Sequence, residues 1–274
     1  MKIESFRTED IDGFLKLAAA ENWLTESWEF EFLLSQFPQG CFAARADNGE
    51  TAGYVTSLRH DKSGWIGNLI VSPEFRGQKI GEKLFVTALE ALRGEGVETV
   101  WLTASKSGMP LYQKFGFKSI DTIIRWVGSG RQKNTATEAK IACESFDPML
   151  NEIDGRAWGD QRTSLMEVIS SRGQLLQRES AFAVLQSCGG ARQIGPFLAP
   201  DYSSADALLK AALNLIPLGA KVYLDAPVSN RAALSLFNRK NIRISGSNEL
   251  MYAGLKPSFN PECIFGLATM GSCG

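Results

Sequence analysis

The chain has 274 residues, and at about 150 residues per domain this length favours two domains. Its 29 basic and 30 acidic residues leave a net charge of -1, which provides no overall field for nucleic acid or a membrane surface. No apolar run approaches the length of a membrane span, and the first residues lack the hydrophobic region of a signal peptide. We therefore expect a cytoplasmic protein that binds neither nucleic acid nor a membrane.

The five cysteines are scattered along the sequence and none belongs to a C-x-x-C pair, so they indicate neither a zinc site nor redox chemistry. The single histidine, His60, lies in the polar run R-H-D-K-S-G and is a poor partner for a catalytic cysteine or serine. We expect His60 to be a solvated loop residue, and we expect no bound metal.

The first elements in chain order are a strand, a helix and a hairpin. Ile3–Phe6 predicts the strand, and Thr8 is a suitable N-cap for the amphipathic helix that follows. Two β-rich runs, Gly40–Ala46 and Thr51–Leu58, then flank the turn Asp47-Asn48-Gly49, which is a strong hairpin signal. These strands predict an antiparallel meander.

A strand, a turn and a helix come next. Ile66–Val71 is a short apolar run closed by Ser72-Pro73, and Leu84–Leu92 has the apolar spacing of an amphipathic helix. The turn between them contains Gly77 and Gly81, and glycine lets a backbone take positive φ and approach a ligand closely.

This turn has the properties of an anion site. The first N–H groups of a helix lack intrahelical partners and lie at the positive end of its dipole, where phosphate binds readily. Arg76 and Lys79 add two cations, so a pyrophosphate is the expected ligand. On spacing alone, an ordinary turn with a solvated basic edge fits equally well.

After the helix, Val97–Thr103 predicts a parallel strand, a short helix carries Leu111 and Tyr112, and the strand Lys118–Val127 closes the first unit. The polar run G-S-G-R-Q-K-N-T-A-T-E-A-K, near residues 128 to 140, predicts a linker or a hairpin tip.

Two segments resemble a known family. V-S-P-E-F-R-G-Q-K-I-G resembles the acetyl-coenzyme A signature of the GNAT superfamily of N-acetyltransferases, Q/R-x-x-G-x-G/A. Arg76 matches its first position and Gly81 its last, whereas Lys79 stands where the middle glycine usually lies. Downstream, A-S-K-S-G-M-P-L-Y-Q-K-F-G-F is similar to the family's N-x-x-A-x-x-L-Y-x-x-x-G-F run, with Ser105 in place of the Asn and Tyr112 at the Tyr.

The second half of the chain repeats the pattern of the first. The run Gln193–Pro200 repeats the strand before the turn, Val222–Ala226 repeats the following strand, and N-R-A-A-L-S-L-F places Phe237 where Tyr112 would be. Its turn, D-Y-S-S-A-D-A, is shorter, lacks glycine and arginine, and has two aspartates that compete for the helix N–H groups. We therefore expect no pyrophosphate there.

The chain thus resembles the tandem GNAT proteins with an active first domain and a degenerate second one. The expected class is α+β, with two tandem GNAT folds, each a mixed and mostly antiparallel sheet flanked by helices. We place the domains at residues 1–130, with the acetyl-CoA loop, and 131–274, degenerate in coenzyme binding. A monomer is plausible because two units in one chain can pair their sheets, and a homodimer stays open.

The resemblance also implies roles for individual residues. The pantetheine arm of acetyl-CoA pairs like an added strand with the backbone of the strand that ends at Val71, and the backbone amide of Val71 stabilises the oxyanion. Tyr112 lies at the position of the general acid that protonates the leaving thiolate. The residues expected to bind the coenzyme are Leu69, Ile70, Val71, Arg76, Gly77, Gln78, Lys79, Ile80, Gly81 and Ser105.

The general base and the acceptor contacts stay open at this stage. Trp65 stands where relatives often place a glutamate, so the proton can leave through water, through Glu26, or through Asp225 of the second domain. In the family the connection after the first helix helps to roof the acceptor pocket, which makes Trp23, Glu26 and Trp28 candidate acceptor contacts. Alternatively, the two tryptophans are half-buried aromatics on a surface helix.

The function implied by this resemblance is transfer of an acetyl group from acetyl-CoA to a primary amine of a small molecule. Two alternatives stay open: an acyl-CoA-binding sensor or interaction module without turnover, and an enzyme that uses a longer acyl group.

Overall fold

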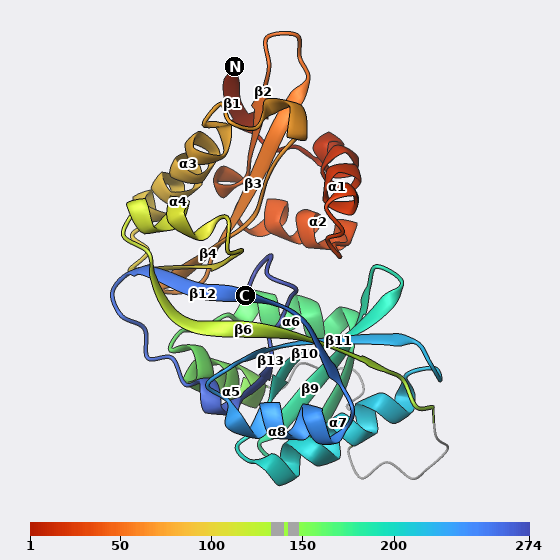
Figure 1. The fold of residues 1–274 in the computed structure, drawn as a ribbon. Coiled ribbons are helices and arrows are strands. Elements are labelled where there is room, and N and C mark those ends of the chain that lie inside the picture. The colour runs from red at the N-terminus through yellow and green to blue at the C-terminus, as the bar shows by residue number, and fades with distance from the viewer. Residues whose placement is uncertain (133–139, 142–147) are drawn as a thin grey trace.

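The computed structural model describes residues 1–132, 140–141 and 148–274, and its strands form one 13-stranded sheet with helices on both faces (Figure 1). The strand order is β1-β2-β3-β4-β5-β12-β6-β11-β10-β9-β8-β7, and β13 pairs with β10 off this path. The core of the predicted linker, residues 133–139, lies outside the described residues.

The strands are β1 (Lys2–Ser5), β2 (Phe42–Arg45), β3 (Thr51–Arg59), β4 (Ser63–Val71), β5 (Thr99–Ala104), β6 (Lys118–Ser129), β7 (Lys140–Ile141), β8 (Gln174–Arg178), β9 (Ala181–Cys188), β10 (Ala191–Leu198), β11 (Lys221–Pro227), β12 (Arg243–Gly254) and β13 (Ile264–Gly266). The helices are α1 (Ile11–Ala20), α2 (Ser27–Gln36), α3 (Ile80–Gly94), α4 (Met109–Lys114), α5 (Pro148–Trp158), α6 (Thr163–Arg172), α7 (Tyr202–Leu215) and α8 (Arg231–Arg239). Among the described residues, no helix is both long and apolar enough to cross a membrane.

The first half has the predicted meander and helices. β2 and β3 form the hairpin around Asn48, and β3 pairs antiparallel with β4. In Figure 1, α3 and α4 lie on one side of these strands and α1 and α2 on the other. α3 packs on the sheet because apolar residues that recur at helical spacing form a buried face, among them Leu84, Ala88 and Leu92. Thr8 begins a 3-10 turn ahead of α1 and is not the N-cap of that helix.

The expectation that Lys118–Val127 closes the first unit is wrong, because the two halves exchange their last long strands. β12, from the end of the chain, occupies the place beside β5, with Tyr252 opposite Trp101. β6 pairs with β12 on one side and with β11 on the other, where Arg125 lies opposite Asp225. The sheet therefore runs without interruption from one half into the other.

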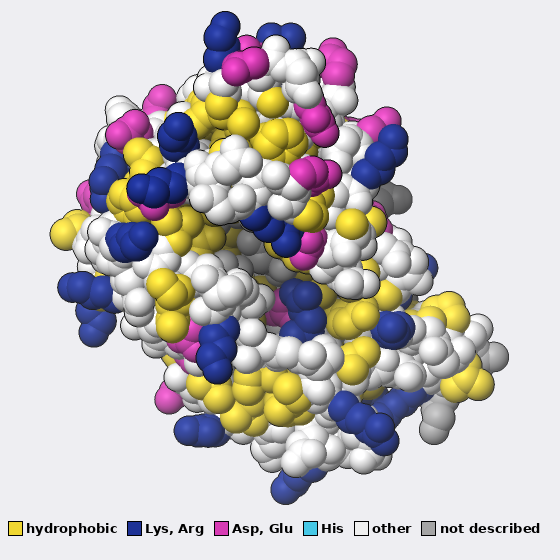
Figure 2. Space-filling view, turned by 45° about the horizontal axis from the view of Figure 1, so that its top comes forward, with side chains coloured by type: hydrophobic (Ala, Val, Ile, Leu, Met, Phe, Trp, Pro, Cys, Tyr) yellow, Lys and Arg dark blue, Asp and Glu magenta, His cyan; other side chains and the backbone are white. Residues whose placement is uncertain are grey.

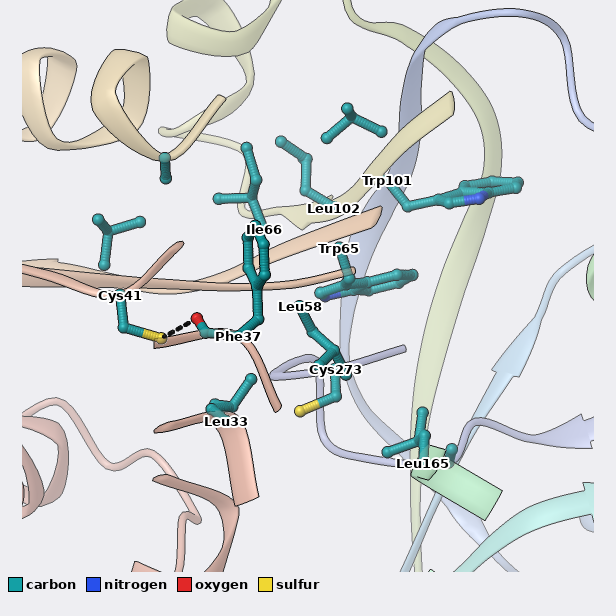
Figure 3. Packing of buried hydrophobic residues seen from close by; sticks show 14 of the residues in the cluster. Leu33, Phe37, Cys41, Leu58, Trp65, Ile66, Trp101, Leu102, Leu165 and Cys273 are labelled. Carbon is teal, nitrogen blue, oxygen red and sulfur yellow. Dashed lines mark hydrogen bonds between the residues drawn. The ribbon is translucent and has the colours of Figure 1, made fainter. Parts of the chain in front are cut away.

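The larger hydrophobic core also includes residues from both halves. Figure 3 shows Trp65 and Trp101 on the neighbouring strands β4 and β5, with Leu165 of α6 and Cys273 of the C-terminal segment in the same cluster. Trp158 of α5 packs edge-on against Trp65 and Trp101, with ring centroids 6.1 and 5.6 Å apart. A second cluster fills the space between α7, α8 and the strands of the second half.

Buried polar groups join the halves near His60. Asp160 accepts hydrogen bonds from the N–H groups of Lys62 and Ser63, and Arg162 forms a fully buried ion pair with Asp154. The prediction of a solvated His60 is wrong, since both of its ring nitrogens are buried. Burial, followed by the charge of Arg162, lowers the pKa of His60 to about 3, so the ring is neutral at pH 7.

Candidate active site

The candidate site begins where β4 and β5 separate. The two strands pair in parallel only from Ser63 and Thr99 to Trp65 and Trp101. Beyond that point β4 stays paired with β3, and β5 stays paired with β12. In the described part of the chain, one edge of β4 from Ile66 onwards is therefore left without a neighbouring strand, and a strand edge of this kind offers N–H and C=O groups to a ligand.

A cavity of about 200 Å³ lies in this opening. Its wall contains residues of β4 and β5, the connection before α2, and α4, together with Arg125 of β6, Asn248 of β12 and the segment 270–272. Figure 2 shows a hollow between the upper and lower parts of the molecule, with basic and acidic side chains beside it. Both halves of the chain thus contribute to the cavity.

β4 contains a bulge at the wall of the cavity. Tyr54 lies opposite Ile70 and Thr56 lies opposite Gly67, so β4 has one extra residue between these pairs. Asn68 takes the left-handed conformation there, with φ of 54°, and its Nδ2 donates to Oγ1 of Thr56 at 3.0 Å. Such a bulge changes the direction in which the following backbone groups point.

The predicted backbone contacts lie along the open edge of β4. Ser72 N–H donates to the Ala52 carbonyl, so the neighbouring Val71 is in a position whose N–H and C=O point away from β3. Nε of Arg76 donates to the Val71 carbonyl at 3.0 Å, and the Val71 N–H faces the open edge. Leu69 lies in the cavity wall, whereas Val71 does not.

The predicted anion loop precedes α3. Gly77 and Lys79 both have positive φ, 78° and 60°, so Lys79 holds the left-handed conformation that explains why glycine is usual at its position. Lys83 N–H donates to the Lys79 carbonyl, which leaves the preceding N–H groups without intrahelical partners. Arg76, which is half exposed, forms an ion pair with Glu21 at 2.5 Å.

Tyr112 and Ser105, two of the predicted site residues, both lie in the wall of the cavity. Oγ of Ser105 accepts a hydrogen bond from Gly108 N–H at 3.1 Å and so supports the start of α4. The ring of Tyr112 packs edge-on against Phe85, with centroids 5.0 Å apart. Burial raises the pKa of Tyr112 to about 12, so its hydroxyl keeps a proton to donate at neutral pH.

Glu26 lies at the N-cap of α2 and is absent from the cavity wall. Its Oε1 accepts a hydrogen bond from Gly189 N–H, in the turn between β9 and β10, at 3.0 Å. Of the two roof tryptophans, Trp23 lies in the cavity wall. Trp28 instead lies under the guanidinium of Arg172, with 5.2 Å from Cζ to the ring centroid.

Of the residues that the structure describes, Glu29 is the acidic one in the cavity wall, and the sequence analysis did not single it out. It occupies the third position of α2, where its Oε1 accepts Glu26 N–H at 3.1 Å and completes a capping box. Its other oxygen accepts a hydrogen bond from the hydroxyl of Ser272. Burial raises the pKa of Glu29 to about 7. The acidic residue three positions after the cap was a signal that could have indicated Glu29.

Asp225, an alternative base, is engaged elsewhere. Its carboxylate forms a bidentate pair with Nε and Nη2 of Arg125, at 2.9 and 2.6 Å, and Nη2 also donates to the Met270 carbonyl. Arg125 itself lines the cavity. The pair therefore fixes a guanidinium at the end of the cavity formed by the second half.

In the second half, the opening between the corresponding strands β10 and β11 is occupied by another strand of the same chain, β13. β10 and β11 pair in parallel at Arg192 and Gln193, and β13 then pairs with β10 at Phe197 and Leu198. At the start of α7, Oδ1 of Asp201 accepts the N–H of Ser204 at 2.9 Å, and this bond lowers the pKa of the aspartate.

Comparison with known proteins agrees with this architecture. Residues 7–117 match the model of the acetyltransferase (GNAT) family, and residues 150–266 match that of an acetyltransferase (GNAT) domain. A Bacillus subtilis protein named as an alanine N-acetyltransferase of ribosomal protein bS18 is 30% identical over 42% of this chain and 80% of its own length. The chain belongs to the GNAT family of acetyltransferases.

Two similar proteins match both halves of the chain. Holothin acyltransferase from Pseudoalteromonas is 22% identical and matches 92% of this chain and 88% of its own length. A Pyrococcus horikoshii protein classed with the acetyltransferases superposes with a TM-score of 0.87 at 26% identity, covering 100% of this chain and 95% of that one. The chain is thus an acyltransferase of the GNAT type with two tandem GNAT folds, as the sequence predicted.

Proposed function

We propose that the first half transfers the acetyl group of acetyl-CoA to a primary amine of a small-molecule acceptor. The observation that carries the proposal is the open edge of β4, which runs from the cationic loop before α3 to the cavity that contains Tyr112. This arrangement suits a long donor with an anionic end and a reactive end. The anionic end can bind at the cationic loop, the connecting arm along β4, and the reactive end in the cavity.

Donor binding would use mainly backbone groups. The diphosphate would lie on the N–H groups around Gly77, Lys79 and Gly81, where the helix dipole and the basic side chains favour negative charge. The pantetheine arm would then extend the sheet along Leu69 to Val71, as an added strand does. An outward N–H on this edge, between Leu69 in the cavity wall and Val71 next to the loop, would stabilise the oxygen of the thioester as it gains negative charge.

The chemistry is direct attack. The acceptor nitrogen forms a bond to the thioester carbon, and the carbon–sulfur bond then breaks. Tyr112 would donate its hydroxyl proton to the departing thiolate, a role supported by its place in the cavity wall and by its hydroxyl being protonated at neutral pH. Without that proton the sulfur would have to leave as a thiolate, which is a poorer leaving group than the thiol, and the carbon–sulfur bond would break more slowly.

We further propose that only residues 1–130 provide the coenzyme site and that residues 131–274 form the degenerate domain. β13 occupies the strand edge that the coenzyme would need, and Asp201 takes up N–H groups at the start of α7. The second half would instead complete the acceptor end of the first site, with neither nucleic acid nor a membrane as partner, and the protein would act as a monomer or homodimer.

The test is release of free thiol from acetyl-CoA by the full chain across a panel of primary amines. Because relatives are named for a protein alanine and for holothin, the panel would include short peptides as well as small amines. Amine-dependent release supports the proposal. Tight coenzyme binding without release for any amine would favour the sensor, and faster release from longer acyl-CoA donors would identify a different acyl group.

A further inference from the structure

Glu29 is a carboxylate at the cavity that the proposed function does not yet use. It is only 7% exposed, and its partners are the Glu26 N–H on one oxygen and the Ser272 hydroxyl on the other. A carboxylate held in a cavity wall between two donors has a defined position and faces the space where the acceptor would bind.

We propose that Glu29 is the general base that takes the proton from the attacking amine, and that Ser272 of the C-terminal segment sets the basicity of Glu29. The inference rests on the proposed function. In the balanced step the nitrogen forms its bond to carbon and gives one proton to the Glu29 carboxylate, while the thiolate leaves and takes the proton of Tyr112. Proton transfer from Glu29 to Tyr112, directly or relayed through solvent, would restore both groups.

The surroundings allow Glu29 to titrate near neutrality. Burial has the largest effect and raises its pKa to about 7; the Ser272 hydrogen bond and the Glu26 N–H lower it, and the Glu26 charge raises it. A base is most effective when its pKa lies near the working pH. Glu29 therefore satisfies this condition without any glutamate on β4.

Other titratable groups near Glu29 keep one protonation state in this range. The Cys188 thiol of β9 and the Cys273 thiol of the C-terminal segment have pKa values raised by burial, so both are neutral at pH 7. Tyr112 is also protonated. Arg125 faces the same cavity from β6 with its charge paired to Asp225.

The position of Ser272 is fixed by contacts with the first half and by a hydrogen bond within the C-terminal segment. Trp65 Nε1 donates to the Gly271 carbonyl at 3.1 Å, and Cys273 N–H donates to Oγ1 of Thr269 at 3.0 Å. Gly67 of β4 lies so close that an added Cβ would be 2.3 Å from the Ser272 carbonyl oxygen. The serine is thus held against the bulged strand, and its hydroxyl is directed by the chain around it.

The experiment measures kcat/KM against pH, from about 5 to 9, for the full chain and three variants. The wild type should gain activity through an ionisation near pH 7. Glu29→Gln should lower kcat by about 10- to 1,000-fold and abolish this rise, while its amide oxygen can still accept the capping N–H. Ser272→Ala should move the rise to higher pH, because it removes a donor that stabilises the charged carboxylate.

The matched control is Glu31→Gln, which changes an exposed glutamate on the same helix outside this cavity and should leave the profile unchanged. An active Glu29→Gln enzyme with the wild-type profile would overturn the role of Glu29. An unchanged profile for Ser272→Ala would overturn the role of Ser272. If a variant does not fold, carboxyl NMR of the wild type decides, since an ordinary pKa for Glu29 contradicts the proposal. Inactivity of the wild type with every amine would instead refute the proposed function.

Discussion

The two halves contain the same strand divergence, and they differ in what lies within it. Between β4 and β5 the sheet opens, and the free edge of β4 borders a cavity. Between β10 and β11 the space is taken by β13, which pairs with β10, while Leu267 N–H donates to the Asp225 carbonyl. Within the described residues, the second half thus pairs this part of its strand edge with its own backbone, at the place where the first half leaves β4 open.

The starts of α3 and α7, and the aligned residues Tyr112 and Phe237, also differ between the two halves. Lys79 precedes α3 in a left-handed conformation, whereas Asp201 precedes α7 and caps it with its carboxylate. Phe237, which the repeat aligns with Tyr112, packs against Trp126 and has no hydroxyl. These differences support the proposal that the first copy binds the coenzyme and that the second copy supports the first.

The largest expected effect comes from separating the halves. A fragment of residues 1–130 should not fold as a soluble monomer, because it lacks β12 and exposes the full edge of β5, and it also lacks Trp158 beneath Trp65. Circular dichroism and size-exclusion chromatography would test this prediction. As a control, co-expression with residues 131–274 should restore a soluble complex. A cooperatively folded, monomeric fragment would show that the first half is an independent domain.

The second largest effect is expected from Tyr112→Phe, which gives the first half the residue type that the second half has at Phe237. Tyr112→Phe should lower kcat by about 10- to 1,000-fold, which is the usual contribution of a positioned acid, with little change in acetyl-CoA affinity. Steady-state kinetics and calorimetry would measure both. Tyr202→Phe, in α7 of the second half, is the control and should retain full activity. Unchanged turnover in Tyr112→Phe would remove this residue from the mechanism.

The elements defined by local pattern were predictable from the sequence. The hairpin around Asn48 and the helix α3 follow from turn chemistry and apolar spacing, and both are present. The strand exchange was not predictable, since β6 and β12 carry no local signal for their partners. The environment of Glu29 also escaped prediction, because it depends on Ser272, which lies 243 positions away in the sequence.

A smaller effect is expected from the charge of the coenzyme loop. Arg76→Glu should weaken acetyl-CoA binding by about tenfold, because it reverses a solvent-screened charge near the proposed diphosphate, and added salt should reduce the difference. Glu21→Gln is the control, since it breaks the ion pair with Arg76 while leaving the cation in place. Calorimetry with equal affinity for Arg76→Glu and wild type would argue against this loop as the anion site.

The smallest expected effect concerns the backbone of the same loop. Lys79 has φ of 60°, a conformation that costs a residue with a Cβ about 1–2 kcal/mol relative to glycine. Lys79→Gly should therefore raise the free energy of unfolding by about 0.5–1 kcal/mol, since the greater freedom of glycine in the unfolded chain offsets part of the gain. Lys83→Gly, at an exposed position inside α3, should instead lower it by about 1 kcal/mol. Denaturant unfolding without coenzyme would measure the free energy of unfolding of both variants. A loss of stability in both would show that the contacts of Lys79 stabilise the protein by more than its backbone strain destabilises it.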